Sequence, residues 1–207
     1  MAILILGPVF MPVLSAVGID PAPLTELMSR LRANPGHLVE GIVIVKDDRL
    51  VFEEYFDGRA HPTYGDGPVS YDRGTKHCLS SVTKSITSLL AGIAIERGEI
   101  AGVDQEILDF FPDLLPLEQP DQAVESATIE DLLTMRHGWE CDDWDPDSAT
   151  YYLSNWEASQ PDLVAATLNL PPATAPGSHF SYCSASTVVL GGLIAKATGM
   201  GIPEYAD

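Results

Sequence analysis

The chain has 207 residues, of which 45% are hydrophobic and 20% are charged. This composition fits one globular domain or most of one, and it excludes a disordered tail or a collagen-like fibre. Thirty acidic residues against eleven basic ones give a formal charge of -19, so a nucleic acid backbone or an anionic membrane surface would repel the protein. We therefore expect neither a nucleic acid nor a membrane as its partner.

The first eighteen residues, 1–18, are uncharged and mostly apolar. Pro8 and Pro12 argue against a continuous membrane-spanning helix. A signal peptide normally begins with positive charge, whereas the first basic residue of this chain is Arg30. The segment is therefore either an apolar leader or a signal-peptide remnant, the compartment stays open, and the folded domain is expected over 19–207.

Helical and strand patterns alternate after this segment. Capping residues, apolar periodicity and Gly or Pro stops define the expected elements. In chain order these are a helix from Pro21 to the stop at 34–36, a hairpin of strands 41–45 and 50–56 around Asp47-Asp48, a loop over 61–74, a long apolar helix over 80–97, a helix from Thr128 to Met135 with Asp131 in a capping box, and weaker helices near 161–169 and 185–198.

Between Asp104 and Asp147 the chain carries fourteen acidic residues and one basic residue, Arg136. So many like charges predict a solvated surface excursion rather than a packed face. Asp143, Asp145 and Asp147 imitate the start of a calcium-binding loop, but the turn glycine and the bidentate glutamate of such a loop are missing. We expect no metal site there.

The cysteines and histidines are expected to play structural roles. Cys78, Cys141 and Cys183 match neither a disulfide framework nor a zinc pattern, so at least one thiol is expected to be unpaired and Cys183 to be a tolerated small residue. His77 and His179 are expected at a rim or in packing. His137 is interpreted as a helix cap, where partial positive charge suits the helix dipole.

One pair of residues suggests catalysis. From His77 to Ile95 the only formally charged side chain is Lys84, and Ser81 precedes it by three residues, on the same face of the expected helix. Burial and the helix dipole both favour a neutral, basic amine at this position. A serine beside such an amine is typical of an activated nucleophile. A solvent-exposed lysine beside a capping serine would have the same spacing, so the pair alone leaves both interpretations open.

Longer motifs carry a resemblance to a known family. The segment Ser81-Val82-Thr83-Lys84-Ser85 resembles the active-site helix of the serine beta-lactamase and penicillin-binding protein superfamily. Four further segments resemble this family in the same order, and the resemblance extends over about 19–207. They are the hairpin of 41–56, the stretch 128–138, the second motif in 176–184 and the helix of 190–199.

The resemblance implies an α/β (α+β) fold of the beta-lactamase/transpeptidase type, with an antiparallel sheet flanked by a helical region. It also implies that Ser81 accepts the acyl group, Lys84 is its general base, and Tyr182 relays the proton to the leaving group. Ser184 stands where many members carry asparagine, and it is expected to bind substrate by donating a hydrogen bond to a carbonyl. This serine favours the carboxylesterase and aminohexanoate-dimer hydrolase branch.

The family's third motif, a Lys or His followed by Thr or Ser and Gly on a late strand, has no counterpart in this sequence. In the family that strand supplies the second backbone N–H of the oxyanion hole, so we expect a C-terminally truncated domain without those strands. The expected activity is cleavage of a small ester or amide through an acyl-enzyme on Ser81, with no metal or organic cofactor. Two alternatives stay open: a beta-lactamase or D-alanyl-D-alanine peptidase, and a non-catalytic binding or sensor module. The sequence does not indicate the oligomeric state.

Overall fold

A computed structural model describes residues 11–34, 36–60, 65, 67–118, 125–148, 150–151 and 159–207 of the chain. The chain divides into two compact units, Met1–Cys78 and Leu79–Asp207. Among the described helices, none combines the length and the apolar character needed to cross a bilayer.

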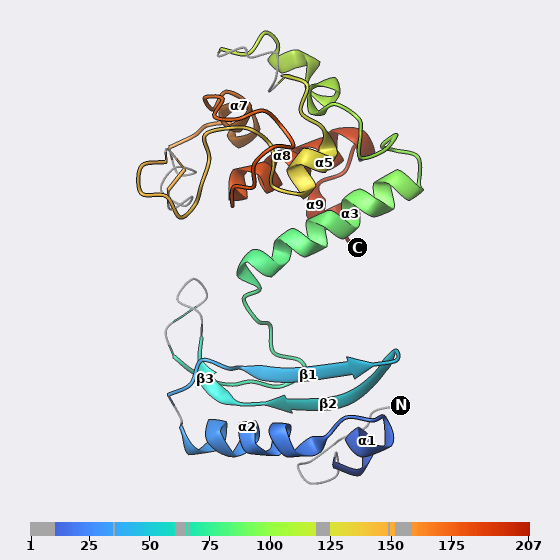
Figure 1. The fold of residues 1–207 in the computed structure, drawn as a ribbon, viewed down its shortest axis with the longest axis vertical. Coiled ribbons are helices and arrows are strands. Elements are labelled where there is room, and N and C mark those ends of the chain that lie inside the picture. Colours follow the sequence, from blue (N-terminus) through green and yellow to red (C-terminus); the bar gives the residue numbers. More distant parts are fainter. Residues whose placement is uncertain are drawn as a thin grey trace. The chain divides into compact units, whose positions relative to one another are not determined.

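The first unit packs two helices against a β-hairpin (Figure 1). Helix α2 (Pro21–Ala33) begins where predicted, because the Asp20 side chain accepts a hydrogen bond from the Ala22 N–H. Strands β1 (Gly41–Lys46) and β2 (Arg49–Tyr55) form the predicted antiparallel hairpin. Helix α1 (Met11–Ala16) lies within the predicted leader, and its Leu14 is fully buried in the core of this unit. The predicted boundary at residue 18 stays a prediction.

Two residues make the turn of this hairpin. Asp47 and Asp48 have φ angles of +50° and +58°, in the left-handed region that non-glycine residues seldom adopt. Positive φ at both central residues is typical of the two-residue turn whose twist matches that of the flanking strands. The turn pairs Lys46 with Arg49.

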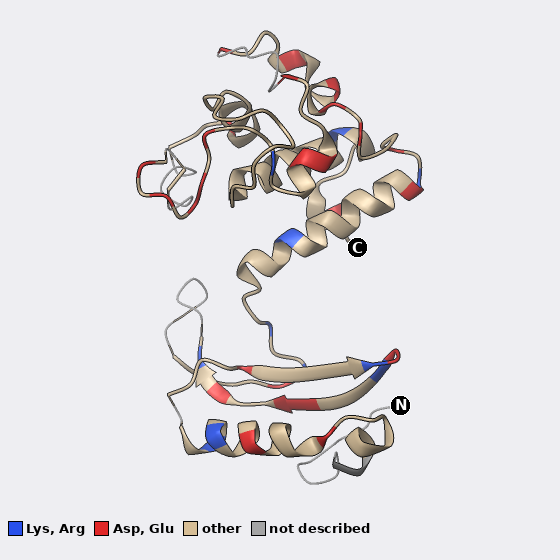
Figure 2. Ribbon diagram, viewed as in Figure 1, with Lys and Arg blue, Asp and Glu red and all other residues tan. Residues whose placement is uncertain are grey.

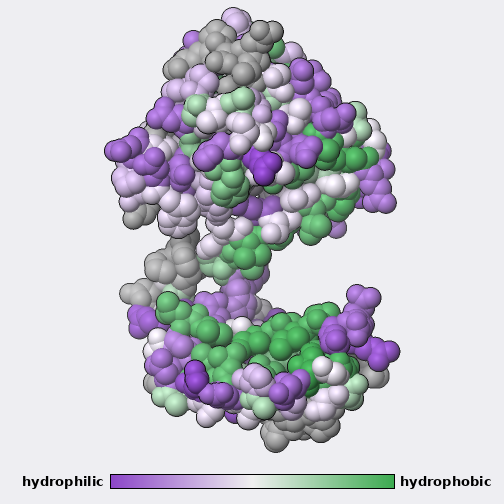
Figure 3. Space-filling model, in the orientation of Figure 1, coloured by the Kyte–Doolittle hydropathy of each residue, from purple (hydrophilic) through white to green (hydrophobic). Residues whose placement is uncertain are grey.

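The two faces of the hairpin differ in burial. Ile42 and Ile44 pack toward the core shared with Leu24 and Phe52. The intervening Val43 and Val45 are 54% and 62% exposed. Figure 3 shows apolar surface over the first unit in this region. The alternation follows from the period of two along a strand.

The loop predicted over 61–74 is wrong in part. Strand β4 (Pro68–Ser70) pairs antiparallel with strand β3 (Asp57–Arg59), and the Ser70 hydroxyl donates to Asp57 Oδ1 at 2.6 Å. Three residues are too short a run to show strand periodicity in the sequence. Residues 61–64 and 66 of the predicted loop lie outside the described residues.

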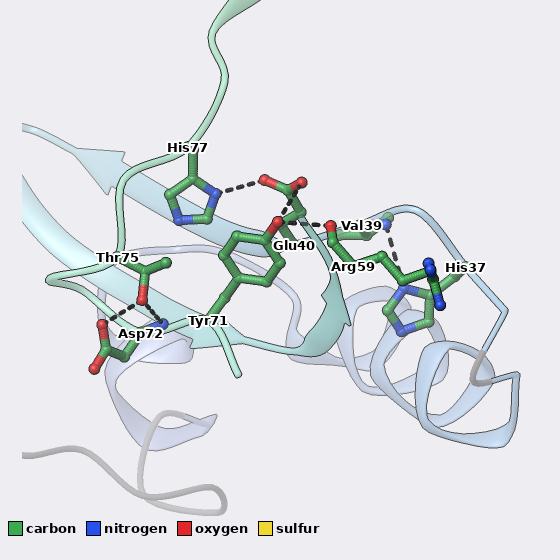
Figure 4. Close-up of polar contacts among 8 residues, drawn as sticks. All are labelled: His37, Val39, Glu40, Arg59, Tyr71, Asp72, Thr75 and His77. Carbon is green, nitrogen blue, oxygen red and sulfur yellow. Dashed lines mark hydrogen bonds and ion pairs between the residues drawn. The ribbon is translucent and has the colours of Figure 1, made fainter. Parts of the chain in front are cut away.

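A polar cluster joins the start of β1 to the segment after β4 (Figure 4). Glu40 accepts a hydrogen bond from the Tyr71 hydroxyl at 3.0 Å, and its second oxygen lies 2.6 Å from His77 Nδ1. The rings of Tyr71 and His77 are stacked with their centroids 4.7 Å apart. His77 therefore packs within the first unit, as expected for it.

The second unit is helical and is built around α8 (Ser184–Thr198), whose Val189, Leu193 and Ile194 are fully buried. Helices α3 (Thr83–Glu96), α5 (Ile129–Leu133), α7 (Leu163–Leu168) and α9 (Ile202–Tyr205) contact it (Figure 1). A 3-10 turn, η3 (Ser80–Val82), precedes α3, and two more, η4 (Ile107–Phe110) and η5 (Pro112–Leu114), follow it. The helices predicted near 161–169 and 185–198 are thus confirmed.

The acidic stretch 104–147 is more than the solvated excursion predicted for it. Most of its described acidic side chains are exposed, and Figure 2 shows them along the loops of this unit. However, the stretch also contributes Ile107, Phe111 and Ile129, each at most 2% exposed, to the core around α8. A count of charged residues did not reveal these core residues, because apolar and acidic side chains are interspersed along the stretch.

The capping box of α5 is confirmed, with Thr128 and Asp131 each accepting from the other's backbone N–H. The helix ends at Leu133 rather than Met135, because Met135 has a φ of +54°. His137 is not the partly charged cap that the sequence predicted. Its side chain is 1% exposed, and burial lowers its pKa to about 4, with the backbone of Ser181 and the Asp131 carboxylate acting in the opposite direction.

Candidate active site

Ser81 and Lys84 are brought together at the start of the long helix. Ser81 lies in η3 and Lys84 in the first turn of α3, so the two elements form the single helical segment predicted from residue 80. Lys84 Nζ lies 3.1 Å from Ser81 Oγ, within hydrogen-bonding distance. The geometry therefore agrees with the predicted pair and allows a proton to pass between the two groups.

Tyr182 lies beside this pair, although it is almost a hundred residues further along the chain. Lys84 Nζ is 5.1 Å from the centroid of the Tyr182 ring, which is a cation–π distance. Tyr182 immediately precedes Cys183, the residue that caps α8. The amine of Lys84 thus contacts both the predicted nucleophile and the predicted proton relay.

Residues 141–143 hold the Tyr182 segment in place. The Ser181 hydroxyl donates to the Cys141 carbonyl at 2.5 Å, and the Asp143 N–H donates to the Tyr182 carbonyl at 2.8 Å. A disulfide joins Cys141 to Cys183, and both residues are buried. Cys183 therefore forms a cross-link and is not the tolerated small residue that the sequence predicted. Cys78 keeps its thiol, as expected of at least one cysteine.

Ser184 is at the expected place, but its hydroxyl is already committed. Ser184 Oγ lies 2.5 Å from Asp143 Oδ2, and the Ser184 N–H points at the same carboxylate, 3.1 Å from Oδ1. A carboxylate only accepts hydrogen bonds, so the single hydroxyl hydrogen of Ser184 lies on this contact. In this structure the Ser184 hydroxyl therefore donates to Asp143, and its donation to a substrate carbonyl stays an untested prediction.

Sequence reasoning missed two residues of this site. Asp143 was assigned to the solvated stretch, and no local pattern relates it to Ser184, which is 41 residues away. Trp144 is 73% exposed, and its ring centroid lies 6.1 Å from that of Tyr182. Its exposure and its place beside Tyr182 appear only in the structure, so the sequence carried no signal for it.

A cavity of about 230 Å³ opens behind this segment, and its lining includes Asp142, His179 and Ser181. Ser81 and Lys84 do not line it, so it is separate from the Ser81–Lys84 contact. His179 is exposed at its edge, as expected of a rim residue. Among the described residues, no three His, Cys, Asp or Glu side chains are grouped so that they could hold a metal ion.

Comparisons with known proteins agree on the fold. A family model, Beta-lactamase, matches residues 25–207. A protein assigned as a 6-aminohexanoate-dimer hydrolase, from Bacillus anthracis, is 23% identical, with a TM-score of 0.60 over 86% of this chain and 44% of its own. An octameric penicillin-binding protein homologue from Pyrococcus abyssi is 22% identical, with a TM-score of 0.61 over 91% of this chain and 41% of its own.

EstCE1, a hydrolase with promiscuous acyltransferase activity, is 20% identical, with a TM-score of 0.60 over 95% of this chain and 49% of its own. The chain therefore spans less than half the length of each of these three proteins. At such identities the likeness shows the fold alone. The predicted mixed fold of helices and antiparallel strands, of the beta-lactamase/transpeptidase type, is confirmed.

Proposed function

Because the chain belongs to the beta-lactamase family and its fold is similar to that of solved hydrolases, we propose that it is a serine hydrolase that forms an acyl-enzyme on Ser81. The observation that carries this proposal is the position of Lys84 Nζ, 3.1 Å from Ser81 Oγ and 5.1 Å from the Tyr182 ring centroid. A serine hydroxyl is a weak nucleophile until a nearby base accepts its proton. We assign that role to Lys84.

The proposed reaction has two halves. In the first, the Ser81 hydroxyl proton passes to Lys84 while Oγ attacks the substrate carbonyl, and the bond to the leaving group breaks as Tyr182 and Lys84 return a proton to that group. In the second, a water molecule attacks the acyl-serine, which releases the acid and restores the Ser81 hydroxyl. The Ser81 N–H is one donor for the oxyanion that forms in each half.

We propose a small ester or amide as substrate, because acyl transfer through a serine can act on both. The assigned activities of two fold neighbours, hydrolysis of an aminohexanoate dimer and acyl transfer, are consistent with this range. A lactam substrate is the alternative within the family. Hydrolysis of the chromogenic lactam nitrocefin at a rate comparable with that of p-nitrophenyl esters would favour it.

The test is covalent labelling. An alkyl fluorophosphonate probe should label the protein, and mass spectrometry of the digested protein should locate the label on Ser81. Ser81→Ala should abolish labelling, while Ser85→Ala, an exposed serine one turn further along the same helix, should leave it unchanged. Equal labelling of wild type and Ser81→Ala would refute the assignment, and an unlabelled wild type would favour a non-catalytic binding module.

A further inference from the structure

Asp143 contacts the Tyr182 segment at three points. Its backbone N–H donates to the Tyr182 carbonyl, its carboxylate accepts the Ser184 N–H, and the same carboxylate accepts the Ser184 hydroxyl. The last of these contacts has an Oγ to Oδ2 separation of 2.5 Å, the short distance usual for a hydroxyl that donates to an ionised acceptor.

The Asp143 carboxylate lies at the N-terminus of α8, which favours its negative charge. Cys183, the N-cap of α8, provides no side-chain hydrogen bond to the helix. Asp143 supplies one from a segment 41 residues earlier in the chain, at the positive end of a helix of 15 residues. Negative charge is favoured at that end, so the carboxylate is held where it also meets the Ser184 hydroxyl.

This contact fixes the direction of the Ser184 hydroxyl. A serine hydroxyl has one hydrogen and two lone pairs, and here the hydrogen is used by Asp143. What Ser184 offers to a ligand is therefore an oxygen that accepts. An accepting oxygen attracts an N–H group and repels a carbonyl or ether oxygen at the same position.

We propose that Asp143 is a positioning residue that sets Ser184 as a hydrogen-bond acceptor, so that the site prefers acyl substrates bearing an N–H near the scissile bond over those bearing oxygen at the same place. This inference rests on the proposed function, since it concerns the substrate of the Ser81 site. It assigns Asp143 a role in specificity and not in the chemical step.

Matched substrate pairs test the proposal. The first pair differs on the acyl side and consists of the p-nitrophenyl esters of N-acetyl-alanine, which has the N–H, and of O-acetyl-lactate, which has oxygen there. The second pair differs in the leaving group and consists of the p-nitroanilide and the p-nitrophenyl ester of one acid. The acylation rate of each compound is measured in single turnover, and the rate of the N–H member is divided by the rate of the oxygen member. Comparing each ratio with that of wild type cancels the intrinsic reactivity of the two compounds.

Ser184→Ala and Asp143→Ala should each lower the ratio about tenfold in at least one pair, the effect of one lost or reoriented hydrogen bond. Asp143→Ala keeps the backbone donor to Tyr182. Ser184→Thr keeps the hydroxyl and should keep the ratio. Asp145→Ala, an exposed acid two residues further along, is the matched control and should also leave it unchanged.

The outcomes separate the two proposals. Ratios that stay at the wild-type value in both variants and both pairs would overturn the role of Asp143, even if Ser81 is labelled normally. Failure of the fluorophosphonate to label wild type would instead overturn the proposed function itself. Asp143 also caps α8, so Asp143→Ala could unfold, and circular dichroism would reveal this. The comparison of Ser184→Ala with Ser184→Thr would then still test whether the Ser184 hydroxyl sets the ratio.

Discussion

Cys183 is bonded to Cys141, and this cross-link falls between Tyr182 and Ser184, two residues of the proposed site. It joins positions 42 residues apart in sequence. The same pair of segments is held by the hydrogen bonds of Ser181 and Asp143. The position of Tyr182 is therefore fixed by contacts with residues distant in sequence as well as by the helix that follows it.

Reduction of this disulfide should destabilise the second unit. Closing a loop of this length lowers the entropy of the unfolded chain by an amount equivalent to about 4 kcal/mol. We expect the melting temperature to fall in dithiothreitol and in a Cys141→Ala/Cys183→Ala variant, measured by circular dichroism. Cys78→Ala leaves the Cys141–Cys183 disulfide in place, so its melting temperature should still fall in dithiothreitol. A melting temperature that does not respond to reductant would contradict the cross-link.

Replacement of Lys84 should slow acylation of Ser81. Loss of a general base typically costs about a hundredfold or more, so Lys84→Met should lower the rate of fluorophosphonate labelling by at least that factor. Lys84→Arg keeps the charge but provides no proton acceptor at neutral pH, and it should be equally slow. Lys76→Met removes an exposed lysine and serves as the control. Wild-type rates in Lys84→Arg would show that only the charge matters.

His137 should make stability depend on pH. Burial lowers its pKa to about 4 in the folded protein, against an ordinary value of 6.5. The unfolded chain therefore takes up the proton first as the pH falls, so the stabilisation is complete above pH 6.5 and is lost between about pH 6.5 and 4. For one such group the loss is up to about 3 kcal/mol.

The measurement compares urea unfolding of wild type and His137→Gln at pH 7 and pH 4. Glutamine stays neutral and can accept the hydrogen bond that His137 Nδ1 receives from the Trp139 N–H. The variant should lose less stability than wild type over this interval. Equal losses would mean that carboxylate titration, which both proteins share, accounts for the whole effect.

Residues that adopt positive φ more readily should stabilise the turn of the β1–β2 hairpin. Asp47 and Asp48 both adopt positive φ, which asparagine and glycine accept more readily. Asp47→Asn/Asp48→Gly should raise the free energy of unfolding by about 1 kcal/mol in urea titrations. Asp48→Val places a β-branched residue at the same angle and should lower it. If both variants have the same stability, the turn is not strained.

Local sequence patterns predicted most of the helices and strands, and they singled out Ser81 and Lys84 of the candidate site. The three-residue spacing of Ser81 and Lys84, the capping box of Thr128 and the hairpin around Asp47 each depend on neighbours in sequence, and periodicity reports such neighbours. Tyr182 was identified by resemblance, and the structure places it beside Lys84.

At the candidate site, the contacts that the sequence did not predict join residues far apart in the chain. Neither the spacing nor the composition relates Asp143 to Ser184 or Cys141 to Cys183. The interpretation of His137 was wrong for a related reason, because its burial arises only in the folded unit. Charge density likewise suggested exposure for a stretch that also supplies core residues.

The exposed indole of Trp144, with its ring centroid 6.1 Å from that of Tyr182, gives this protein a built-in optical reporter. Tryptophan emission shifts with the polarity of its surroundings, so an acyl group or ligand that displaces water next to Tyr182 would change the spectrum of this side chain. Occupancy of the proposed site could then be followed in real time without a chromogenic leaving group. Unreactive compounds that only bind would become measurable by the same signal.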